Sequence, residues 1–452
     1  MIRVAVIGAG WAGATAALML ARAGIHTTVF EANSIAGGRA RVVDKSGKMF
    51  DNGQHLLLGA YQRSLAVIDS LHATATGAML PSTPSTSPPS PAPYLRLPLM
   101  LKSAPKLPAA LSLSAPNLPA PLHLLAAILT AGGLSFFEKL SAIVWAGKHL
   151  RGEAIDERAT VSHLLEGQPI RVRELLWEPL CIAALNTPAE IASASVFVEV
   201  LKRSFTGDAR GSDLIIPRVD LTAMLPAPAL EAVRSLGGDV RLSAFVTAVA
   251  ATTDAATVAL RDGTTHTFDF LIMATGPQHL PRLLSGMPAA SAMSHALGEL
   301  AYEPITTLHF DFPHVDLGQS ERAPMRMLSG DPGQWLFWQP LANGHWRASV
   351  VISADHRSGE GEESSLTSAT LAQLRLSYAL PTPTWQFMVT EKRATYSCTP
   401  TQVGLLTRLP KRIGRLLFAG DWCVPELPAT LEAAVISGER AAQKIISEIH
   451  HG

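Results

Sequence analysis

The hydrophobic pattern at the start of the chain predicts an alternating strand and helix order. Residues Ile2 to Ile7 form a mostly apolar run of strand length, which indicates a buried strand. A glycine-rich turn follows, and Ala14 to Ala23 is so rich in Ala and Leu that it predicts a helix, which Gly24 ends. His26 to Phe30 predicts a second buried strand. This order is typical of a doubly wound, mostly parallel α/β sheet.

The middle of the chain changes to a helical pattern. Residues 81–93 are so rich in Pro and Ser that they predict an extended surface loop. Beyond them, Leu122 to Leu150 and residues 160–205 carry apolar residues at helical spacing. The uncharged stretch Leu107 to Phe137 is long enough to cross a bilayer, but four prolines and a Gly-Gly pair interrupt it. We therefore expect no membrane-spanning helix there.

Strand patterns return after residue 213. Val240 to Val249 and Thr257 to Leu260 predict strands, and Asp262-Gly263 is a hairpin turn signal. Phe268 to Ala274 predicts a strongly apolar strand that ends at Thr275-Gly276.

The last third of the chain predicts a second sheet and a return to the first. Residues 300–390 alternate and contain four tryptophans, which indicates an antiparallel sheet with an aromatic face. Arg415 to Ala419 predicts another buried strand, and a helix is expected from about Thr430.

Composition and charge narrow the class of protein. The 452 residues suggest two or three domain-sized units, with 47% hydrophobic and only 16% charged residues. The formal net charge is zero, so no overall field attracts nucleic acid, and we expect no nucleic-acid partner. The three cysteines are widely spaced, which predicts neither a disulfide framework nor a zinc site and fits the reducing cytoplasm. No other metal-ligand cluster stands out, so we expect no metal.

A glycine loop after the first strand predicts a dinucleotide site. Gly8 permits a tight turn, Gly10 lets the backbone approach a pyrophosphate, and Gly13 lets helix and strand pack closely. The helix start supplies free N–H groups for phosphate. Glu31 ends the second strand, where its carboxylate would accept hydrogen bonds from the adenosine ribose.

Two further motifs turn this prediction into an FAD site. Gly37-Gly38-Arg39 can bring backbone and a planar guanidinium to the pyrophosphate. Gly420-Asp421 follows a buried strand, where Asp421 can accept from a ribityl hydroxyl, and the helix near Thr430 can direct its N-terminal amides at the flavin. The combination distinguishes FAD enzymes of the glutathione-reductase type from NAD dehydrogenases. The expected cofactor-binding residues are Gly8, Gly10, Trp11, Ala12, Gly13, Glu31, Ala32, Gly37, Gly38, Arg39, Ala40, Gly53, Gln54, His55, Val246, Ala274, Thr275, Gly276, Gly420, Asp421, Pro428, Ala429, Thr430 and Leu431.

These motifs lie far apart, which predicts a discontinuous domain organisation. We expect a Rossmann-like FAD-binding domain built from residues 1–75, 206–277 and 391–452. An α+β substrate-binding domain, with apolar helices and an antiparallel sheet, would be inserted as residues 76–205 and 278–390.

Three longer stretches carry a family resemblance. They are Asp51 to Tyr61, Pro179 to Thr187, and Ala419 to Trp422 together with Leu427 to Glu432. With the glycine motifs they place the chain close to the flavin amine oxidase and phytoene desaturase superfamily, and it resembles in particular the squalene-associated FAD-dependent desaturases, which are hydroxysqualene dehydroxylases. The resemblance implies reduction of hydroxysqualene to squalene by reduced FAD in hopanoid synthesis. Alternatives are a carotenoid desaturase, a flavin amine oxidase, and a flavoprotein without catalytic activity.

The implied reaction needs an acid for the leaving hydroxyl. Candidates are His55, Asp51, Glu178 and Glu432. Each could instead have a structural role. His55 could be hydrogen-bonded to backbone, and Asp51 could hold a turn. Glu178 could be a buried, paired carboxylate, and Glu432 an acid in the first turn of a helix. Cys398 could attach FAD covalently or be a buried apolar residue.

The implied substrate is a long apolar isoprenoid, which fits the low charge content. The apolar residues 95–146 could form its tunnel or a peripheral contact with the inner face of the membrane from the cytoplasm, or simply an ordinary helical core. A second glycine loop after a strand is not evident, so the external electron donor is left open.

Overall fold

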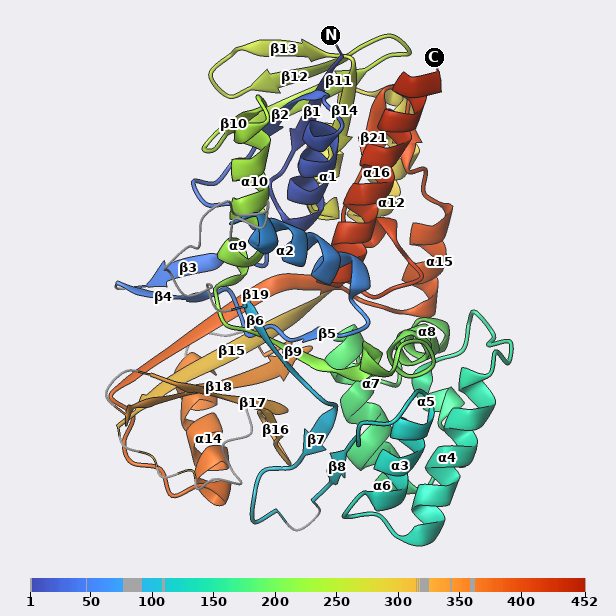
Figure 1. Cartoon of the computed structure of the whole chain (residues 1–452), viewed down its shortest axis with the longest axis vertical. Coiled ribbons are helices and arrows are strands. Elements are labelled where there is room, and N and C mark those ends of the chain that lie inside the picture. The colour runs from blue at the N-terminus through green and yellow to red at the C-terminus, as the bar shows by residue number, and fades with distance from the viewer. Residues whose placement is uncertain are drawn as a thin grey trace, which may run out of the picture.

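The structure is a computed structural model that describes residues 2–45, 47–75, 92–107, 110–313, 315, 317, 325–341, 344–357 and 362–451. Most of the predicted Pro/Ser-rich loop 81–93 lies outside these residues. Figure 1 shows two stacked parts, with both described chain ends at the top of the upper one.

A six-stranded sheet forms the centre of the upper part. Its order is β10-β2-β1-β14-β21-β20, and all neighbours are parallel except the last pair. In its register Val4 of β1 pairs with both Thr27 and Phe270. The predicted mostly parallel sheet is thus confirmed. The strands are β1 (Arg3–Ile7), β2 (His26–Phe30), β10 (Asp239–Arg241), β14 (Phe270–Met273), β20 (Arg412–Ile413) and β21 (Leu416–Phe418).

The helices α1 (Trp11–Arg22) and α16 (Leu431–His451) pack side by side next to this sheet (Figure 1). Their approach requires glycine, because a Cβ on Gly438 would lie 2.2 Å from the carbonyl oxygen of Ala12. The alanine-rich face of α1 is fully buried in the same contact. The first and last quarters of the chain therefore form one packed unit around β1.

Two strand predictions need correction. The predicted strand Val240–Val249 is two strands in different sheets, β10 and β11 (Val246–Ala251), because Ser243 takes a left-handed backbone conformation with φ +55° and turns the chain. The predicted strand Phe268–Ala274 is also divided. Phe268 ends β13 (Thr265–Phe268), and β14 starts after Asp269.

A small antiparallel sheet holds the predicted hairpin. Its order is β11-β12-β13, and β12 (Ala256–Leu260) pairs with β13 across the turn. Gly263 supplies the positive φ of +87° that the turn needs. The Asp262-Gly263 hairpin prediction is therefore confirmed.

The lower part contains the predicted antiparallel sheet, with the order β16-β17-β18-β15-β19. Phe312, Trp338, Trp346 and Tyr378 form the predicted aromatic face, but not all four tryptophans share it, because successive residues of a strand point to opposite faces. Trp335 and Phe337 join one core cluster, whereas Trp338 joins another. A helix that the pattern did not predict, α14 (Glu362–Ser377), also lies within this stretch. The strands are β15 (Tyr302–Phe312), β16 (Met325–Met327), β17 (Trp335–Pro340), β18 (Trp346–Ser353) and β19 (Trp385–Tyr396).

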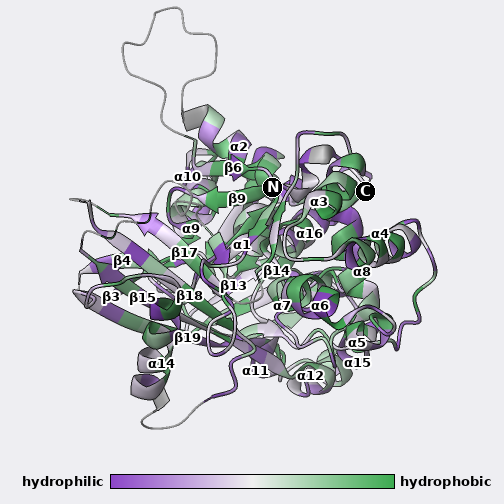
Figure 2. Cartoon of the chain, turned by 90° about the horizontal axis from the view of Figure 1, so that it is seen from below, coloured by the Kyte–Doolittle hydropathy of each residue, from purple (hydrophilic) through white to green (hydrophobic). Residues whose placement is uncertain are grey.

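Helices beside this sheet confirm the helical pattern of residues 122–205. Figure 2 shows hydrophobic residues over much of them, including α3 and α8. Among the described residues, none of the helices has the length and apolar character needed to cross a membrane. They are α3 (Leu122–Thr130), α4 (Phe136–Leu150), α5 (Val161–Leu164), α6 (Ile170–Val172), a π-helical turn Arg173–Trp177, α7 (Glu178–Leu185) and α8 (Ala194–Phe205).

The remaining helices and strands lie around these sheets and helices. The helices are α2 (Gln62–Ala75), α9 (Leu221–Met224), α10 (Pro226–Ser235), α11 (Leu280–Leu283), α12 (Ser291–Gly298) and α15 (Pro400–Arg408). The strands are β3 (Val42–Lys45), β4 (Lys48–Asp51), β5 (Leu57–Leu58), β6 (Tyr94–Leu97), β7 (Met100–Lys102), β8 (Ser112–Ser114) and β9 (Leu214–Pro217).

Candidate functional site

One large cavity extends from the glycine loop of the parallel sheet into the lower part of the molecule. Its volume is about 1060 Å³, at the upper end of the usual range for ligand pockets. Every predicted cofactor-binding residue lines it except Gly13. Three sequence segments that are hundreds of residues apart therefore meet at one site.

The glycine loop has the geometry that a phosphate cradle requires. Gly8 has φ +99°, and a Cβ there would lie 2.6 Å from the carbonyl oxygen of Ala274. A Cβ on Gly13 would lie 1.9 Å from the carbonyl oxygen of Gly8, so Gly13 acts in helix–strand packing behind the cavity. No side chain of the described residues caps Gly10, which leaves the first N–H groups of α1 available to a ligand.

Glu31 is buried and already holds the loop together. One carboxylate oxygen accepts from the Ala9 backbone N–H at 2.7 Å, and the other accepts from the backbone and side chain of Asn33 at 2.9 Å. A carboxylate has about four lone-pair sites, so the oxygens can still accept hydroxyl groups of a ligand. The sequence predicted the position of Glu31 but not these protein partners.

Arg39 joins the two ends of the chain across the cavity. Its guanidinium donates to Asp421 at 2.6 Å and to the Ala394 carbonyl at 2.6 Å. Burial acts to lower the pKa of Arg39, but the charge and hydrogen bond of Asp421, with Glu391 and Tyr302 nearby, outweigh it and the pKa is raised. Arg39 was predicted to bind the pyrophosphate and Asp421 a ribityl hydroxyl. In the structure the two side chains bind each other.

Cations exceed carboxylates along the described cavity wall. Four carboxylates line it, namely Glu31, Glu391, Asp421 and Glu432. Six permanently charged cations line it, namely Arg39, Arg41, Arg203, Arg282, Lys392 and Arg393. Without Arg203, which lies on α8 at the apolar end, five cations remain against four carboxylates, and this surplus favours an anionic group such as a pyrophosphate. The sequence reasoning missed Arg282 and Arg393, because neither lies in a recognisable motif.

The other end of the cavity is apolar. It begins at β7 and extends between α7, α8 and the antiparallel sheet. Arg203 on α8 also lines it, and its charge is paired with Glu199 at 2.7 Å. The side chains here offer mostly apolar surface to an apolar chain. The main lining residues are Leu99, Leu101, Leu180, Val200, Leu201, Phe205, Met325, Trp335, Phe337 and Val351.

Two of the four predicted acids do not reach the cavity. Asp51 is not part of the described lining; it accepts from the Leu221 N–H at 2.9 Å at the start of α9, and burial raises its pKa to about 6. Glu178 also lies outside the described lining and forms an ion pair with Arg173 at 3.0 Å. It is partly exposed, not buried as its sequence context suggested.

The other two acids line the cavity but have structural partners. Glu432 accepts from the backbone of Arg63 and from both the backbone and hydroxyl of Ser64 at 2.7–2.9 Å, which caps α2. The His55 ring nitrogen Nδ1 lies 3.1 Å from the carbonyl oxygen of Gly53. Burial lowers the pKa of His55, which favours the neutral imidazole.

Tyr61 also lines the cavity, although it is not among the site residues predicted from the sequence. Burial raises the pKa of its phenol, so it keeps its proton, and the Thr430 hydroxyl hydrogen-bonds to it. Thr430 itself accepts from the Ala433 N–H at 3.2 Å. The Thr430 oxygen has a second lone pair, so its hydroxyl can accept from Tyr61 or donate to it; when it donates, the Tyr61 hydrogen is available to a ligand.

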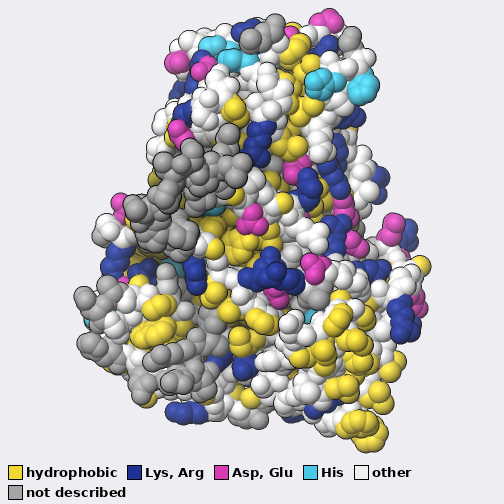
Figure 3. Space-filling model, viewed as in Figure 1, with side chains coloured by type: hydrophobic (Ala, Val, Ile, Leu, Met, Phe, Trp, Pro, Cys, Tyr) yellow, Lys and Arg dark blue, Asp and Glu magenta, His cyan; other side chains and the backbone are white. Residues whose placement is uncertain are grey.

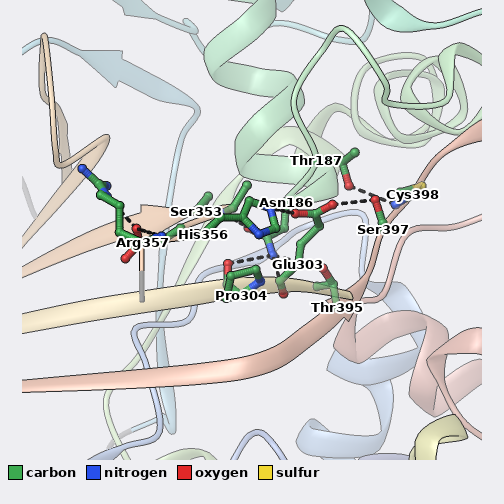
Figure 4. A network of polar contacts seen from close by, with 12 residues as sticks. Asn186, Thr187, Glu303, Pro304, Ser353, His356, Arg357, Thr395, Ser397 and Cys398 are labelled. Carbon is green, nitrogen blue, oxygen red and sulfur yellow. Dashed lines mark hydrogen bonds and ion pairs between the residues drawn. The ribbon is translucent and has the colours of Figure 1, made fainter. Parts of the chain in front are cut away.

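A buried polar network fixes the cavity wall where α7 ends (Figure 4). Asn186 ends α7 with φ +48°, and its amide donates to Thr395, Glu303 and Pro304 on β19 and β15. Figure 4 also shows Glu303 between Ser397 and His356, with contacts of 2.5 and 2.6 Å. The Pro179–Thr187 stretch therefore connects the helices to the sheet.

Cys398 belongs to the edge of this network rather than to the cavity. Its backbone N–H donates to the Thr187 hydroxyl at 2.9 Å, and the described lining does not include it. Burial raises the pKa of its thiol to about 12. All three cysteines are buried and free of disulfides.

The residues present fit FAD. The uncapped helix start and the cation surplus suit its pyrophosphate, and the Thr275 hydroxyl on the cavity wall is buried without a partner among the described residues. When FAD is bound, the glycine loop, Glu31 and the Arg39–Asp421 pair would hold it.

Comparisons with known proteins agree with this site. The family described as flavin containing amine oxidoreductase matches residues 11–446. The chain is 28% identical over 459 residues to the hydroxysqualene dehydroxylase of Sinorhizobium fredii and 27% identical over 456 residues to that of Rhodopseudomonas palustris, with 98% of each chain covered.

A solved structure shows the same fold. Cyclohexylamine oxidase from Brevibacterium oxydans superposes with a TM-score of 0.68 at 17% identity and with 99% of both chains covered. Together with the family match and the FAD-compatible cavity, this leads to one conclusion. The chain belongs to the family of flavin-containing amine oxidoreductases and is an FAD-dependent oxidoreductase.

Proposed function

We propose that the protein reduces hydroxysqualene to squalene as a step of hopanoid biosynthesis. The observation that carries the proposal is the two-ended cavity, in which a polar, cation-rich FAD end continues into a long apolar end. Similarity to three hydroxysqualene dehydroxylases over 98% of their length, at 25–28% identity, supports this substrate. The proposed FAD-binding domain is of the glutathione-reductase type and comprises residues 1–75, 206–277 and 391–452, with residues 76–205 and 278–390 binding substrate.

The reaction replaces a carbon–oxygen bond by a carbon–hydrogen bond. When bound in its reduced form, FAD would supply the hydride, and the hydroxyl would leave as water after taking up one proton. The apolar wall excludes solvent from the substrate chain and orients it along the cavity. An external donor restores the reduced cofactor, and the enzyme acts in the cytoplasm, at the inner face of the membrane where such a substrate resides.

Tyr61 is the group we propose as the proton donor. It lines the cavity, it is neutral at physiological pH, and Thr430, its hydrogen-bond partner, has a hydroxyl hydrogen of its own to donate to it. The neutral His55 imidazole, with Nδ1 directed at Gly53, has no second hydrogen to give. Glu432 already accepts three hydrogen bonds from α2, which favour its ionised form although burial raises its pKa.

The test is an anaerobic single-turnover experiment. Photoreduced holoenzyme is mixed with hydroxysqualene, flavin reoxidation is followed by absorbance, and squalene is measured by gas chromatography. We expect flavin oxidation and squalene in equal amounts. No reaction with hydroxysqualene, combined with reduction of the oxidised flavin by squalene or phytoene, would show a desaturase instead.

A conservative variant tests the proton donor. Tyr61→Phe keeps the ring and removes the hydroxyl, so flavin reoxidation by hydroxysqualene should slow by about 10²- to 10⁴-fold. Flavin content and reoxidation by oxygen, which do not use this proton, should stay as in the wild type. His55→Gln, as the matched control on the same wall, should retain more activity than Tyr61→Phe. The reverse order would assign the proton to His55.

A further inference from the structure

An apolar surface covers the outer side of α3 and α4. Figure 3 shows hydrophobic side chains gathered at the lower right, over these helices. Phe136 and Phe137 are 67% and 79% exposed, although large apolar side chains are usually buried. We call this surface the α3–α4 face; it consists of Leu118, Leu122, Leu125, Leu129, Phe136, Phe137, Leu140 and Val144.

The α3–α4 face is distinct from the side of the two helices that packs on the core. The opposite side of the same helices is already buried, through Ile128, Ala142 and Trp145 among others. Both sides of the helix pair are thus apolar, and only one of them has a partner in the described chain. Clustered exposed apolar side chains of this extent mark a site for another molecule or a membrane.

The tip of the face is held rigidly. Ser135 and Glu138 form a capping box at the start of α4, which holds Phe136 and Phe137 in the first helical turn. Arg171 donates to the Gly133 carbonyl at 2.6 Å, and Lys139 donates to the Leu129 carbonyl at 3.1 Å. The backbone that carries the two aromatic rings is therefore held in place.

Cations outnumber carboxylates in the segment that carries the α3–α4 face, although the whole chain has a formal net charge of zero. Residues 118–151 contain three cations, Lys139, Lys148 and Arg151, and one carboxylate, Glu138. Lys148 pairs with Glu153 at 3.4 Å, so Lys139 and Arg151 carry the excess positive charge. The Glu138 carboxylate lies 3.6 Å from the Arg171 guanidinium, so its charge is offset. An apolar face beside excess cations is the combination that binds anionic lipid headgroups and the acyl chains beneath them.

We infer that the α3–α4 face docks on the surface of an anionic lipid bilayer. The inference rests on the proposed function, because a bilayer is where a C30 hydrocarbon substrate dissolves. Packed side chains also connect the helix that carries this face to the apolar end of the cavity. Trp145 of α4 contacts Trp177 with ring centroids 4.4 Å apart, and Trp177 directly precedes α7, whose Leu180 lines the apolar end.

The experiment measures partition of the FAD-loaded protein onto vesicles. Vesicles of phosphatidylcholine with a third phosphatidylglycerol are compared with pure phosphatidylcholine at low and high salt. We expect tighter binding to the anionic vesicles, with the difference reduced by salt. Phe136→Ser combined with Phe137→Ser should lower the partition coefficient by about 100-fold.

Controls separate this result from unfolding and from the proposed function. Leu376→Ser removes a 70% exposed leucine from α14 and should bind vesicles as the wild type does. Leu140→Gln with Val144→Gln is a second face variant, for use if the phenylalanine variant does not fold. Turnover of detergent-solubilised hydroxysqualene should be unchanged in both face variants. If the wild type binds vesicles but never reacts with hydroxysqualene, the proposed function fails and the docking surface stands.

Two results would overturn the inference. One is a wild-type protein that binds neither kind of vesicle, or face variants that bind vesicles as tightly as the wild type does. The other is a doubled particle mass in light scattering that the phenylalanine variant abolishes, which would make the α3–α4 face a contact between two copies of the chain.

Discussion

Replacing Asn186 should destabilise the protein in a way that depends on the replacing residue. Its side chain makes four contacts in the buried network of Figure 4. The amide nitrogen lies 3.0 Å from the Thr395 hydroxyl and 3.3 and 3.4 Å from two backbone carbonyls, and its oxygen accepts from the Ala354 N–H at 2.9 Å. The backbone is left-handed, with φ +48° and ψ +33°.

The magnitude follows from these contacts. Removing the side chain leaves the Ala354 N–H unpaired in a partly buried site, at about 1–3 kcal/mol, and loses the bond to Thr395, at about 1 kcal/mol. Alanine also disfavours the left-handed conformation by about 1 kcal/mol, a cost that glycine avoids. We therefore expect Asn186→Ala to lower the free energy of unfolding by about 4 kcal/mol and Asn186→Gly by about 3 kcal/mol.

The assay is urea unfolding of the FAD-loaded protein, followed by flavin fluorescence and circular dichroism. Asn117→Ala, at an exposed asparagine, is the control and should change the free energy of unfolding by less than about 0.5 kcal/mol. A glycine variant less stable than the alanine variant would refute the backbone argument. Two variants as stable as the wild type would refute the network argument.

Three further changes test packing, titration and the site assignment. Gly438→Ala forces a Cβ against the Ala12 carbonyl and should cost about 2–3 kcal/mol in urea unfolding with loss of FAD, whereas Gly147→Ala, in an open position of α4, should add about 0.5–1 kcal/mol. Burial raises the pKa of Asp51 to about 6, so the folded state favours the protonated carboxyl. The stabilisation of the fold by this proton is complete below the unfolded pKa of about 4 and is lost as pH rises through 6. Asp51→Asn should therefore gain melting temperature relative to the wild type between pH 4 and 6, and a constant difference would contradict this. Glu178→Gln should change the free energy of unfolding by at most about 1 kcal/mol and leave turnover intact; a tenfold loss of turnover would return Glu178 to the site.

The cofactor end of the cavity was predictable because backbone geometry determines it. The positive φ of Gly8 and the close packing at Gly13 can be met only by glycine, so the sequence itself marks these positions. Glu31 and Gly420 follow buried strands, and the ends of adjacent parallel strands meet at one edge of a sheet. Local pattern therefore predicted both the sheet and the residues around the glycine loop.

Contacts between distant side chains were not predictable in this way. The sequence separates Arg39 from Asp421 by 382 residues, and no local pattern shows that they pair. Ser243 turns the chain within an apolar run that otherwise predicts one strand. Helix α14 escaped prediction because its apolar residues follow a weak helical pattern within a stretch dominated by strands.

The acid candidates show why the chemistry was harder to predict than the cofactor. A carboxylate or imidazole is chosen from sequence for its intrinsic pKa, but its role depends on which hydrogen bonds it already makes. Glu432 is committed to capping α2, and Asp51 to the start of α9. A phenol is passed over because its ordinary pKa is high, but it is neutral at physiological pH and carries a hydrogen that it can donate to a leaving hydroxyl. Tyr61 has both properties on the cavity wall, and for that reason its hydroxyl is the one to remove first.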